Sequence, residues 1–291
     1  MMDLHLHTYY SDGSISPEEL VLRAKANGVT KIAITDHDGT RGIKEGLEAG
    51  ARHGIEVIPG VELSAGTEEG EIIPGERAAY AHILGYEIDP ANEPLQAAIR
   101  DILQKRHERN VKILAALGEI GYPLTMEDCQ MRPQQDYIGK PLMARALVKK
   151  GYISSPSEAF EPGKFLEHPD VKSNRRPKIP MKEAISLIRG AGGFAVLAHP
   201  LKTKWLGKEE YDENGEDIRF KRLEILLDQL CEWGLEGMEC HYSTHTPEEI
   251  EKLVAIAQRR GLKITAGSDF HGPEFKSWLD IGVTVKPESQ R

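Results

Sequence analysis

Short apolar segments alternate with amphipathic segments over most of the chain, and this alternation limits the folds that it can adopt. The apolar segments predict strands at 2–6, 31–35, 55–59, 81–86, 194–198, 235–240 and 263–267. The amphipathic segments predict helices at 16–25, 42–53, 181–190, 218–233 and 246–260. Ser16 with Glu19, and Thr246 with Glu249, form the capping-box pattern of a helix start. Strands that alternate with helices are typical of an α/β fold with a mainly parallel sheet.

The number of these units indicates how the sheet is arranged. Seven βα-like units predict a closed or nearly closed parallel barrel, a distorted TIM-like (β/α)7 fold. An open, doubly wound sheet is the alternative. A short terminal strand is also predicted at 281–285.

The alternation stops in the middle of the chain. Apolar residues at three- and four-residue spacings predict helical structure there: Leu95, Ile99, Ile102, Leu103, Ile113, Leu114 and Leu117. A further helix is predicted at 141–152, and the proline-rich polar segment 154–180 reads as a loop. We therefore predict a barrel formed by residues 1–93 and 181–291, with residues 94–180 as a helical insertion that caps the substrate.

Composition and charge exclude several classes of protein. The net charge of −9 argues against a protein that coats duplex nucleic acid, which would normally be basic. A small anionic ligand can still bind if metal ions and a few placed cations attract it. No apolar run approaches the length of a membrane helix and no secretory signal is visible, so a cytoplasmic location is expected. The three cysteines have no spacing that predicts disulfides or a thiolate zinc site.

Potential metal ligands stand at or near the ends of the predicted strands. They are His5, His7, His37, Glu62, His82, His199, Asp269 and His271. In a parallel barrel the carboxyl ends of all strands meet at one rim, where active sites form. Imidazole mixed with carboxylate suits Zn²⁺, Mn²⁺ or Fe²⁺, whereas Ca²⁺ and Mg²⁺ prefer oxygen ligands. The ligands outnumber the needs of one ion, so we predict a cluster of two or three divalent ions in which Glu62 can bridge.

Six segments together resemble the PHP (polymerase and histidinol phosphatase) family: DLHLHTYYSDG, AITDHDGT, GVELSA, HILGY, AHP and GSDFHG. The resemblance implies a distorted seven-stranded βα barrel, usually with three metals. It assigns one metal to His5, His7, Glu62 and Asp269. It assigns a second to Glu62, His82 and His199, and a third to Asp12, His37 and His271.

Within this family the segments GKPLMARALV and THTPEE are most similar to the nucleoside 3′,5′-bisphosphate phosphatases and the related 5′-to-3′ exoribonuclease. The resemblance implies a substrate that carries a 5′-phosphate. The first segment more often reads GRPHxARAL in that subgroup. Lys140 and Leu142 depart from this pattern, which weakens the inference about specificity but leaves the metal chemistry untouched.

Residues outside the ligand set are expected to bind substrate or to assist catalysis. Cations for the distal phosphate or backbone are predicted at Lys140, Arg145, Arg175, Arg176, Lys178 and Lys202. His241 and His245 are candidates for donating a proton to the leaving oxygen. Asp38 is expected to hold His37 or another ligand from behind.

The sequence thus predicts a metal-dependent hydrolase of phosphate esters, acting on a nucleotide or a short 5′-phosphorylated oligonucleotide, with no membrane partner and no stable duplex binding. Three alternatives remain: a phosphatase of another small phosphate such as histidinol phosphate, a non-catalytic metal-binding regulatory module, and an amidohydrolase.

Overall fold

The structure, a computed structural model, describes residues 1–132, 135–275 and 278–282. Its strands are β1 (Met2–Leu6), β2 (Lys31–Ile34), β3 (Glu56–Gly66), β4 (Tyr80–Tyr86), β5 (Ile179–Pro180), β6 (Phe194–Leu197), β7 (Gly237–Tyr242) and β8 (Lys263–Gly267). Its α-helices are α1 (Pro17–Ala26), α2 (Gly42–His53), α3 (Glu93–Glu119), α4 (Lys140–Lys149), α5 (Pro169–Lys172), α6 (Met181–Gly190), α7 (Ile218–Glu232) and α8 (Pro247–Arg259).

The strands form a nearly closed barrel in the order β1-β2-β3-β4-β6-β7-β8, with β5 added beside β3. At the open seam β1 meets the segment after β8, where Leu6 bridges Phe270 and the amide of Asp269 donates to the His5 carbonyl at 2.9 Å. The barrel is therefore confirmed over the open doubly wound sheet. The capping boxes predicted at Ser16 and Thr246 begin α1 and α8, as expected.

The prediction of an all-parallel barrel is wrong at β4, which runs antiparallel to both β3 and β6. The connection 67–79 between β3 and β4 contains no helix, so the chain turns back beside β3. A parallel neighbour would require a crossover, which is usually helical.

Strand β3 is also longer than predicted, because it continues through Gly60 to Gly66 and places Glu62 inside a strand. A side chain at Gly60 would collide with the carbonyls of Gly85 and Ile34, so glycine is required there.

Apolar side chains fill the barrel and separate it from its helices. Inside the barrel, successive strands contribute Leu4, Ala33, Ile58, Leu84, Tyr86 and Val196 to one packed cluster. A larger apolar layer lies between the sheet and α6, α7, α8 and the first half of α3. Apolar side chains thus pack the barrel interior away from the rim, and the largest group of polar side chains lies at the rim.

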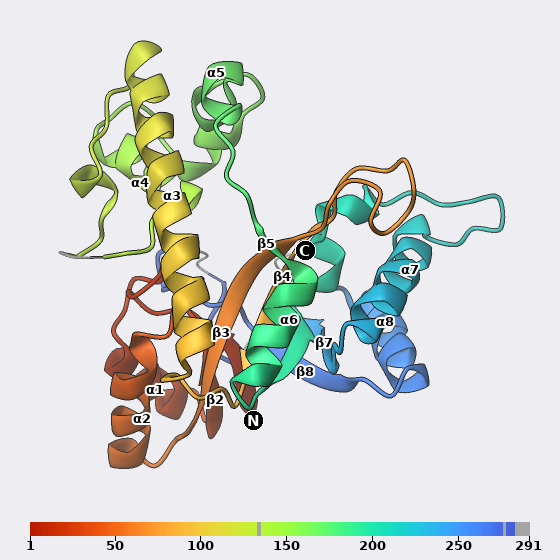
Figure 1. Ribbon diagram of the computed structural model, residues 1–291. Helices are drawn as coiled ribbons and strands as arrows, with labels where there is room; N and C mark the ends of the chain where they lie inside the picture. The colour runs from red at the N-terminus through yellow and green to blue at the C-terminus, as the bar shows by residue number, and fades with distance from the viewer. Residues whose placement is uncertain (133–134, 276–277, 283–291) are drawn as a thin grey trace.

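Helix α3 starts against the barrel beside β3 and continues well beyond it, with α4 and α5 beside its far half (Figure 1). Its early residues, including Ile99 and Ile102, pack in the barrel's apolar layer. Its later residues belong to a second core, in which the buried side chains all come from residues 113–171. The predicted loop 154–180 contains short helical turns, α5 and the two-residue strand β5.

Two remaining expectations concern the ends of the chain and the membrane. The strand predicted at 281–285 falls largely outside the described residues, and its first two positions form a turn. Within the described ranges, no helix has both the length and the apolar character that a bilayer crossing requires.

Candidate metal centre

Nine imidazole and carboxylate side chains converge at the rim of the barrel. They come from β1 and the loop after it (His5, His7, Asp12), from the ends of β2 and β6 (His37, His199), from within β3 and β4 (Glu62, His82), and from the segment after β8 (Asp269, His271). His5, His7 and Glu62 are fully buried, and the others are buried or nearly so. Residues far apart in the sequence thus form a single cluster.

Glu62 lies at the centre of this cluster. Its Oε2 faces three imidazoles, at 3.4 Å from His5 Nε2, 3.4 Å from His7 Nε2 and 2.8 Å from His37 Nδ1. Its Oε1 faces two more, at 2.7 Å from His82 Nδ1 and 3.1 Å from His199 Nε2. Because both oxygens face separate groups of nitrogen atoms, this carboxylate has the geometry of a bridging ligand.

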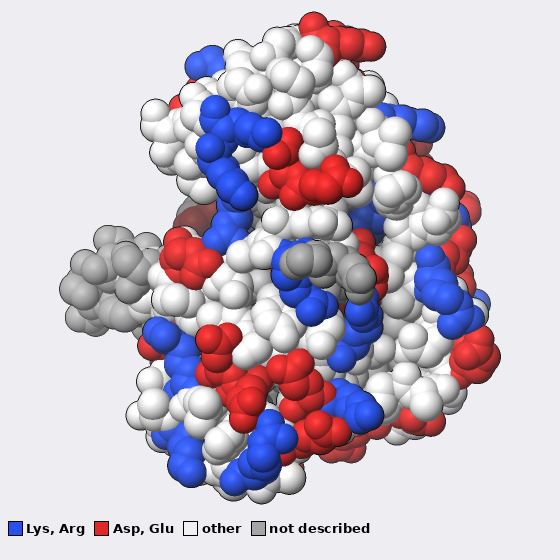
Figure 2. All heavy atoms as spheres, turned by 90° about the vertical axis from the view of Figure 1, so that its left-hand side faces the viewer, with Lys and Arg blue, Asp and Glu red and all other residues white. Residues whose placement is uncertain are grey.

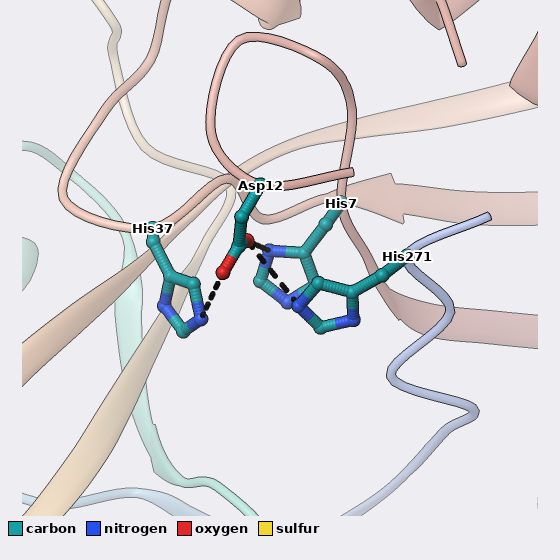
Figure 3. Close-up of side chains that lie close together, drawn as sticks. All are labelled: His7, Asp12, His37 and His271. Carbon is teal, nitrogen blue, oxygen red and sulfur yellow. Dashed lines mark ion pairs between the residues drawn. The ribbon is translucent and has the colours of Figure 1, made fainter. Parts of the chain in front are cut away.

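Asp12 organises a second part of the cluster, in which four side chains point toward one another (Figure 3). Its Oδ1 lies 3.3 Å from His271 Nε2 and 4.0 Å from His7 Nδ1, and its Oδ2 lies 3.9 Å from His37 Nε2. Asp269 faces the opposite side, with Oδ1 3.5 Å from His5 Nε2 and 3.3 Å from His7 Nε2. His7 therefore stands between the two carboxylates.

The donor atoms fit divalent metal ions. Four overlapping sets of three or four ligand atoms lie within 4.8 Å of one another, and together they include all nine residues. Several of these buried atoms lack a hydrogen-bond partner: His5 Nε2, both ring nitrogens of His7, His37 Nδ1, Asp12 Oδ1 and Glu62 Oε2. Buried polar atoms without partners are costly, and a cation bound among them would satisfy them.

Electrostatics also favour a cation. Burial alone would raise the pKa of Glu62, but His37, His82 and His5 hold that pKa well below its ordinary value. Burial alone would lower the pKa of His82, but Tyr80 and Glu62 outweigh it and raise that pKa to about 10. Asp12 and Asp269 similarly overcome burial and raise the pKa of His271 to about 9. The carboxylates are thus ionised, and without a metal part of the cluster holds protons in place of cations.

Metal binding should therefore release protons and weaken in acid. A metal ligand must lose the proton on its coordinating atom, so protons compete with the ion. We expect the affinity for Mn²⁺ to fall as the pH is lowered from 8 to 6, and titration calorimetry in buffers of different ionisation enthalpy to detect proton release at pH 7. An affinity that is independent of pH, with no proton release, would contradict this account of the cluster.

Three non-glycine residues of the rim have a positive φ: 47° at Asp38, 26° at His199 and 57° at Asp269. Each such conformation costs about 1–3 kcal/mol. All three follow strand ends that carry potential ligands. Strain at these positions is consistent with a backbone that is held for the geometry of the site.

Side chains behind the cluster, which the sequence prediction missed, hold it in place. Glu239 is fully buried in β7 and lies 2.9 Å from His5 Nδ1 through Oε1. Asp36 accepts from the Thr8 amide at 2.8 Å and the Ser11 hydroxyl at 2.6 Å, which shapes the loop to Asp12. Alternation within β7 could have revealed Glu239, because a charged residue there must face the barrel interior.

The three predicted catalytic side chains are not placed as expected. Asp38 does not hold His37; its oxygens accept from the Ser64 amide and from Arg106 and Arg176. His245 is buried behind Tyr242, with Nδ1 3.1 Å from the Cys240 carbonyl, and burial lowers the pKa of its imidazole to about 4.

His241 makes no hydrogen bond or ion pair with the cluster among the described residues. The register of β7 shifts between Glu239 and His241, so that Tyr242 reaches the rim instead. The Tyr242 hydroxyl donates to Asp269 Oδ2 at 2.7 Å. Tyr242 thus occupies the rim position at which His241 was expected.

Four of the six predicted substrate cations line one cavity of about 1000 Å³ that opens beside His37 and His82: Lys140, Arg175, Arg176 and Lys178. Lys202 lines an adjoining cavity of about 290 Å³, donates to the Tyr242 hydroxyl and lies 3.8 Å from Asp269.

Arg145 is not in either cavity, because α4 directs it to Glu274 at 2.8 Å and over the Phe275 ring. Leu142 is buried in the insertion core, so only Lys140 of the two departures from the family pattern faces the cavity.

Two further arginines of α3, Arg106 and Arg109, line the same cavity. Arg106 is 5% exposed, pairs with Asp38 and lies over the Tyr137 ring, which stacks on His37. Arg109 has no carboxylate within ion-pair distance in the described part of the chain, and burial beside Arg106 and Arg176 lowers its pKa to about 10. Arg106 occupies a position of the buried stripe of α3 where an apolar side chain is expected, and that signal could have identified it.

Several Lys and Arg side chains gather at this cavity. On the face shown in Figure 2, Lys and Arg side chains are interspersed with Asp and Glu over both the insertion and the barrel. Such a mixed surface does not form a continuous basic track for a duplex.

Comparison with known proteins gave a family match and full-length relatives. A model described as the PHP domain matches residues 3–140. A 5′–3′ exoribonuclease of Haemophilus influenzae is 31% identical over 97% of this chain and 93% of its own length. A 3′,5′-nucleoside bisphosphate phosphatase of Chromobacterium violaceum is 32% identical over 97% and 91%.

Two further proteins are similar over nearly the whole chain. A phosphoribosyl 1,2-cyclic phosphate 1,2-diphosphodiesterase of Eggerthella lenta is 30% identical over 97% of this chain and 98% of its own length. A solved structure from Bifidobacterium adolescentis, described as a candidate metal-dependent phosphoesterase, superposes with a TM-score of 0.76 at 28% identity and covers 99% of this chain and 93% of its own.

Proposed function

This chain belongs to the PHP domain family of metal-dependent phosphoesterases, and we propose that its substrate is a nucleotide or a short oligonucleotide that carries a 5′-phosphate. The observation that carries the proposal is the position of the arginine-lined cavity directly beside the cluster around Glu62. A substrate with a phosphate at the cluster and a second anionic group about one nucleotide away would contact both.

The proposed metal assignment is the one that the resemblance to the PHP family implies. His5, His7, Glu62 and Asp269 would hold one divalent ion, Mn²⁺, Fe²⁺ or Zn²⁺. Glu62 with His82 and His199 would hold a second. Asp12, His37 and His271 would hold a third. When bound, such ions supply an acidified water as nucleophile and positive charge for the phosphoryl oxygens.

The chain's own residues orient and select the substrate. Lys202 stands beside Asp269 at the mouth of the smaller cavity, where its ammonium can contact a phosphoryl oxygen or the leaving oxygen. Arg106 and Arg176 both pair with Asp38, and Arg109 lines the same cavity beside them. The Nε of each of these three arginines has no hydrogen-bond partner among the described residues. This excess of fixed positive charge suits a phosphate, which arginine binds with paired hydrogen bonds.

We further propose that residues 94–180 act as the cap of the substrate site. Lys140, Arg175 and Arg176 of this segment line the larger cavity opposite the barrel rim. Because Tyr137 of the same segment stacks on His37 at 5.3 Å between ring centroids, the cap is in direct contact with the cluster. Movement of the cap would therefore alter the shape of the substrate site.

A substrate panel tests the proposal. Phosphate or nucleotide release should be measured with and without Mn²⁺ on adenosine 3′,5′-bisphosphate, a 5′-phosphorylated RNA trimer, histidinol phosphate and a ribose 1,2-cyclic phosphate. We expect Mn²⁺-dependent turnover of one or both of the first two, with a kcat/KM at least about tenfold above that of the others, which corresponds to about 1.4 kcal/mol.

Other outcomes of the panel distinguish the alternatives. Preference for histidinol phosphate or the cyclic phosphate would overturn the proposed substrate class while keeping the phosphoesterase. Metal binding without turnover of any phosphate ester would favour a regulatory module, and hydrolysis of amides alone would favour an amidohydrolase.

A further inference from the structure

Glu239 is a buried carboxylate that belongs to none of the ligand sets yet contacts two members of the cluster. It lies in β7, is fully buried, and has no arginine or lysine partner among the described residues. Its Oε1 lies 2.9 Å from His5 Nδ1, and its Oε2 accepts from the main-chain amide of His199 at 2.7 Å. Burial of a carboxylate at this depth is costly, and these two donors offset part of the cost.

The contact with His5 determines which ring nitrogen faces the cluster. A carboxylate oxygen accepts, so the Nδ1 of His5 must carry the hydrogen that it donates. The neutral ring then has a free lone pair on Nε2, which points into the cluster at 3.4 Å from Glu62 Oε2 and 3.5 Å from Asp269 Oδ1. This is the tautomer in which Nε2 can coordinate a metal.

The contact with His199 fixes a strained main chain. His199 follows β6 with φ at 26°, a conformation that a non-glycine residue adopts rarely. The Glu239 carboxylate accepts the amide hydrogen of that residue, and the same backbone conformation places His199 Nε2 3.1 Å from Glu62 Oε1. One side chain thus restrains two residues that face the two oxygens of Glu62.

We propose that Glu239 is a positioning residue that sets the tautomer of His5 and the backbone of His199 for metal binding. The proposal rests on the proposed function, because it assumes that the cluster holds metal ions. Space around the carboxylate is restricted, since a side chain at Gly267 would come within 2.4 Å of Glu239 Oε1 and 2.3 Å of His5 Cβ. The packing therefore leaves the carboxylate little freedom to choose other partners.

Glu239→Gln tests this idea with little change of shape. Glutamine has a single acceptor oxygen, so it cannot accept from both the His5 ring and the His199 amide. In one orientation the glutamine NH₂ group faces the His199 main-chain N–H, so that two donors meet and the hydrogen bond is lost. In the other orientation the NH₂ group donates to His5 Nδ1, which forces the ring hydrogen onto Nε2. Either arrangement impairs one ligand, and we expect the affinity for Mn²⁺ to fall about 10- to 100-fold.

The measurements are Mn²⁺ affinity by calorimetry and, in protein loaded with diamagnetic Zn²⁺, the position of the His5 ring hydrogen by ¹⁵N NMR. Asp217→Asn is the matched control, since Asp217 is a buried carboxylate that caps α7 and pairs with Arg219 away from the cluster. We expect wild type and Asp217→Asn to bind Mn²⁺ equally and to keep the hydrogen on His5 Nδ1. Glu239→Asp keeps two acceptor oxygens on a shorter side chain that cannot reach both donors at their present distances. It should bind Mn²⁺ more tightly than Glu239→Gln but more weakly than wild type, and it remains the test if the glutamine variant does not fold.

The outcomes separate this inference from the proposed function. A folded Glu239→Gln with wild-type Mn²⁺ affinity and an unchanged His5 tautomer would overturn the positioning role, even if the enzyme hydrolyses nucleotides. The same holds if Glu239→Asp is the only folded variant and binds no more weakly than wild type. If wild type binds Mn²⁺ as expected but hydrolyses no phosphate ester, the proposed function fails while the role of Glu239 stands.

Discussion

Glu62→Gln should reduce turnover by at least about a thousandfold, equivalent to about 4 kcal/mol of transition-state stabilisation. Five histidines lie within 3.4 Å of this carboxylate, so the loss of its charge removes the group that would bridge the metals. Bound Mn²⁺, measured by elemental analysis, should fall with the activity. The melting temperature should drop to that of the metal-free protein, because an ion that binds only the folded state stabilises it.

The control for this variant lies on the same strand. Glu56→Gln changes the same side chain at the far end of β3, where Glu56 is exposed and pairs with Lys31 at 2.8 Å. Its turnover and metal content should equal those of wild type. A Glu62→Gln protein that keeps its metals and more than about a tenth of wild-type turnover would exclude Glu62 as a bridging ligand.

Arg109→Ala should raise KM for adenosine 3′,5′-bisphosphate about 10- to 100-fold, because a charge-assisted hydrogen bond contributes about 1.5–3 kcal/mol. The fold should not lose stability. Burial and two neighbouring arginines lower the pKa of Arg109 to about 10, so the guanidinium stays charged at neutral pH but its charge costs folding stability. Removal of the charge should therefore leave the melting temperature unchanged or raise it, which is the pattern of a residue retained for binding.

Two comparisons make this prediction specific. KM for p-nitrophenyl phosphate, which has no second anionic group, should be unaffected by Arg109→Ala. Arg145→Ala removes an arginine that pairs with Glu274 outside the cavity and should leave both KM values unchanged. If Arg109→Ala raised KM equally for both substrates, or for neither, Arg109 would not recognise a distal phosphate.

The arrangement of the cluster could be expected from the sequence because strand ends converge in any barrel of this kind. His5, His37 and His199 each stand at or just beyond the end of a short apolar segment, and those segments are strands of the barrel. The direction of β4 was harder to predict. Strand propensity locates β4 but does not show its direction, and the absence of a helix in 67–79 was the available evidence for an antiparallel return.

Residues supplied by other elements were less predictable. The bulge in β7 breaks the two-residue alternation, so that Tyr242 rather than His241 reaches Asp269. Arg145 and Arg176 look equivalent in the sequence, yet one pairs outside the cavity and the other lines it. The orientation of the insertion on the barrel determines that difference, and long-range packing determines the orientation.

Anomalous diffraction from crystals of the wild-type protein loaded with Mn²⁺ tests the central claim most directly. The account predicts two or three anomalous peaks at the barrel rim, one of them in contact with Glu62 and lost in Glu62→Gln. A well-ordered rim without an anomalous peak, in protein loaded at pH 8, would contradict it.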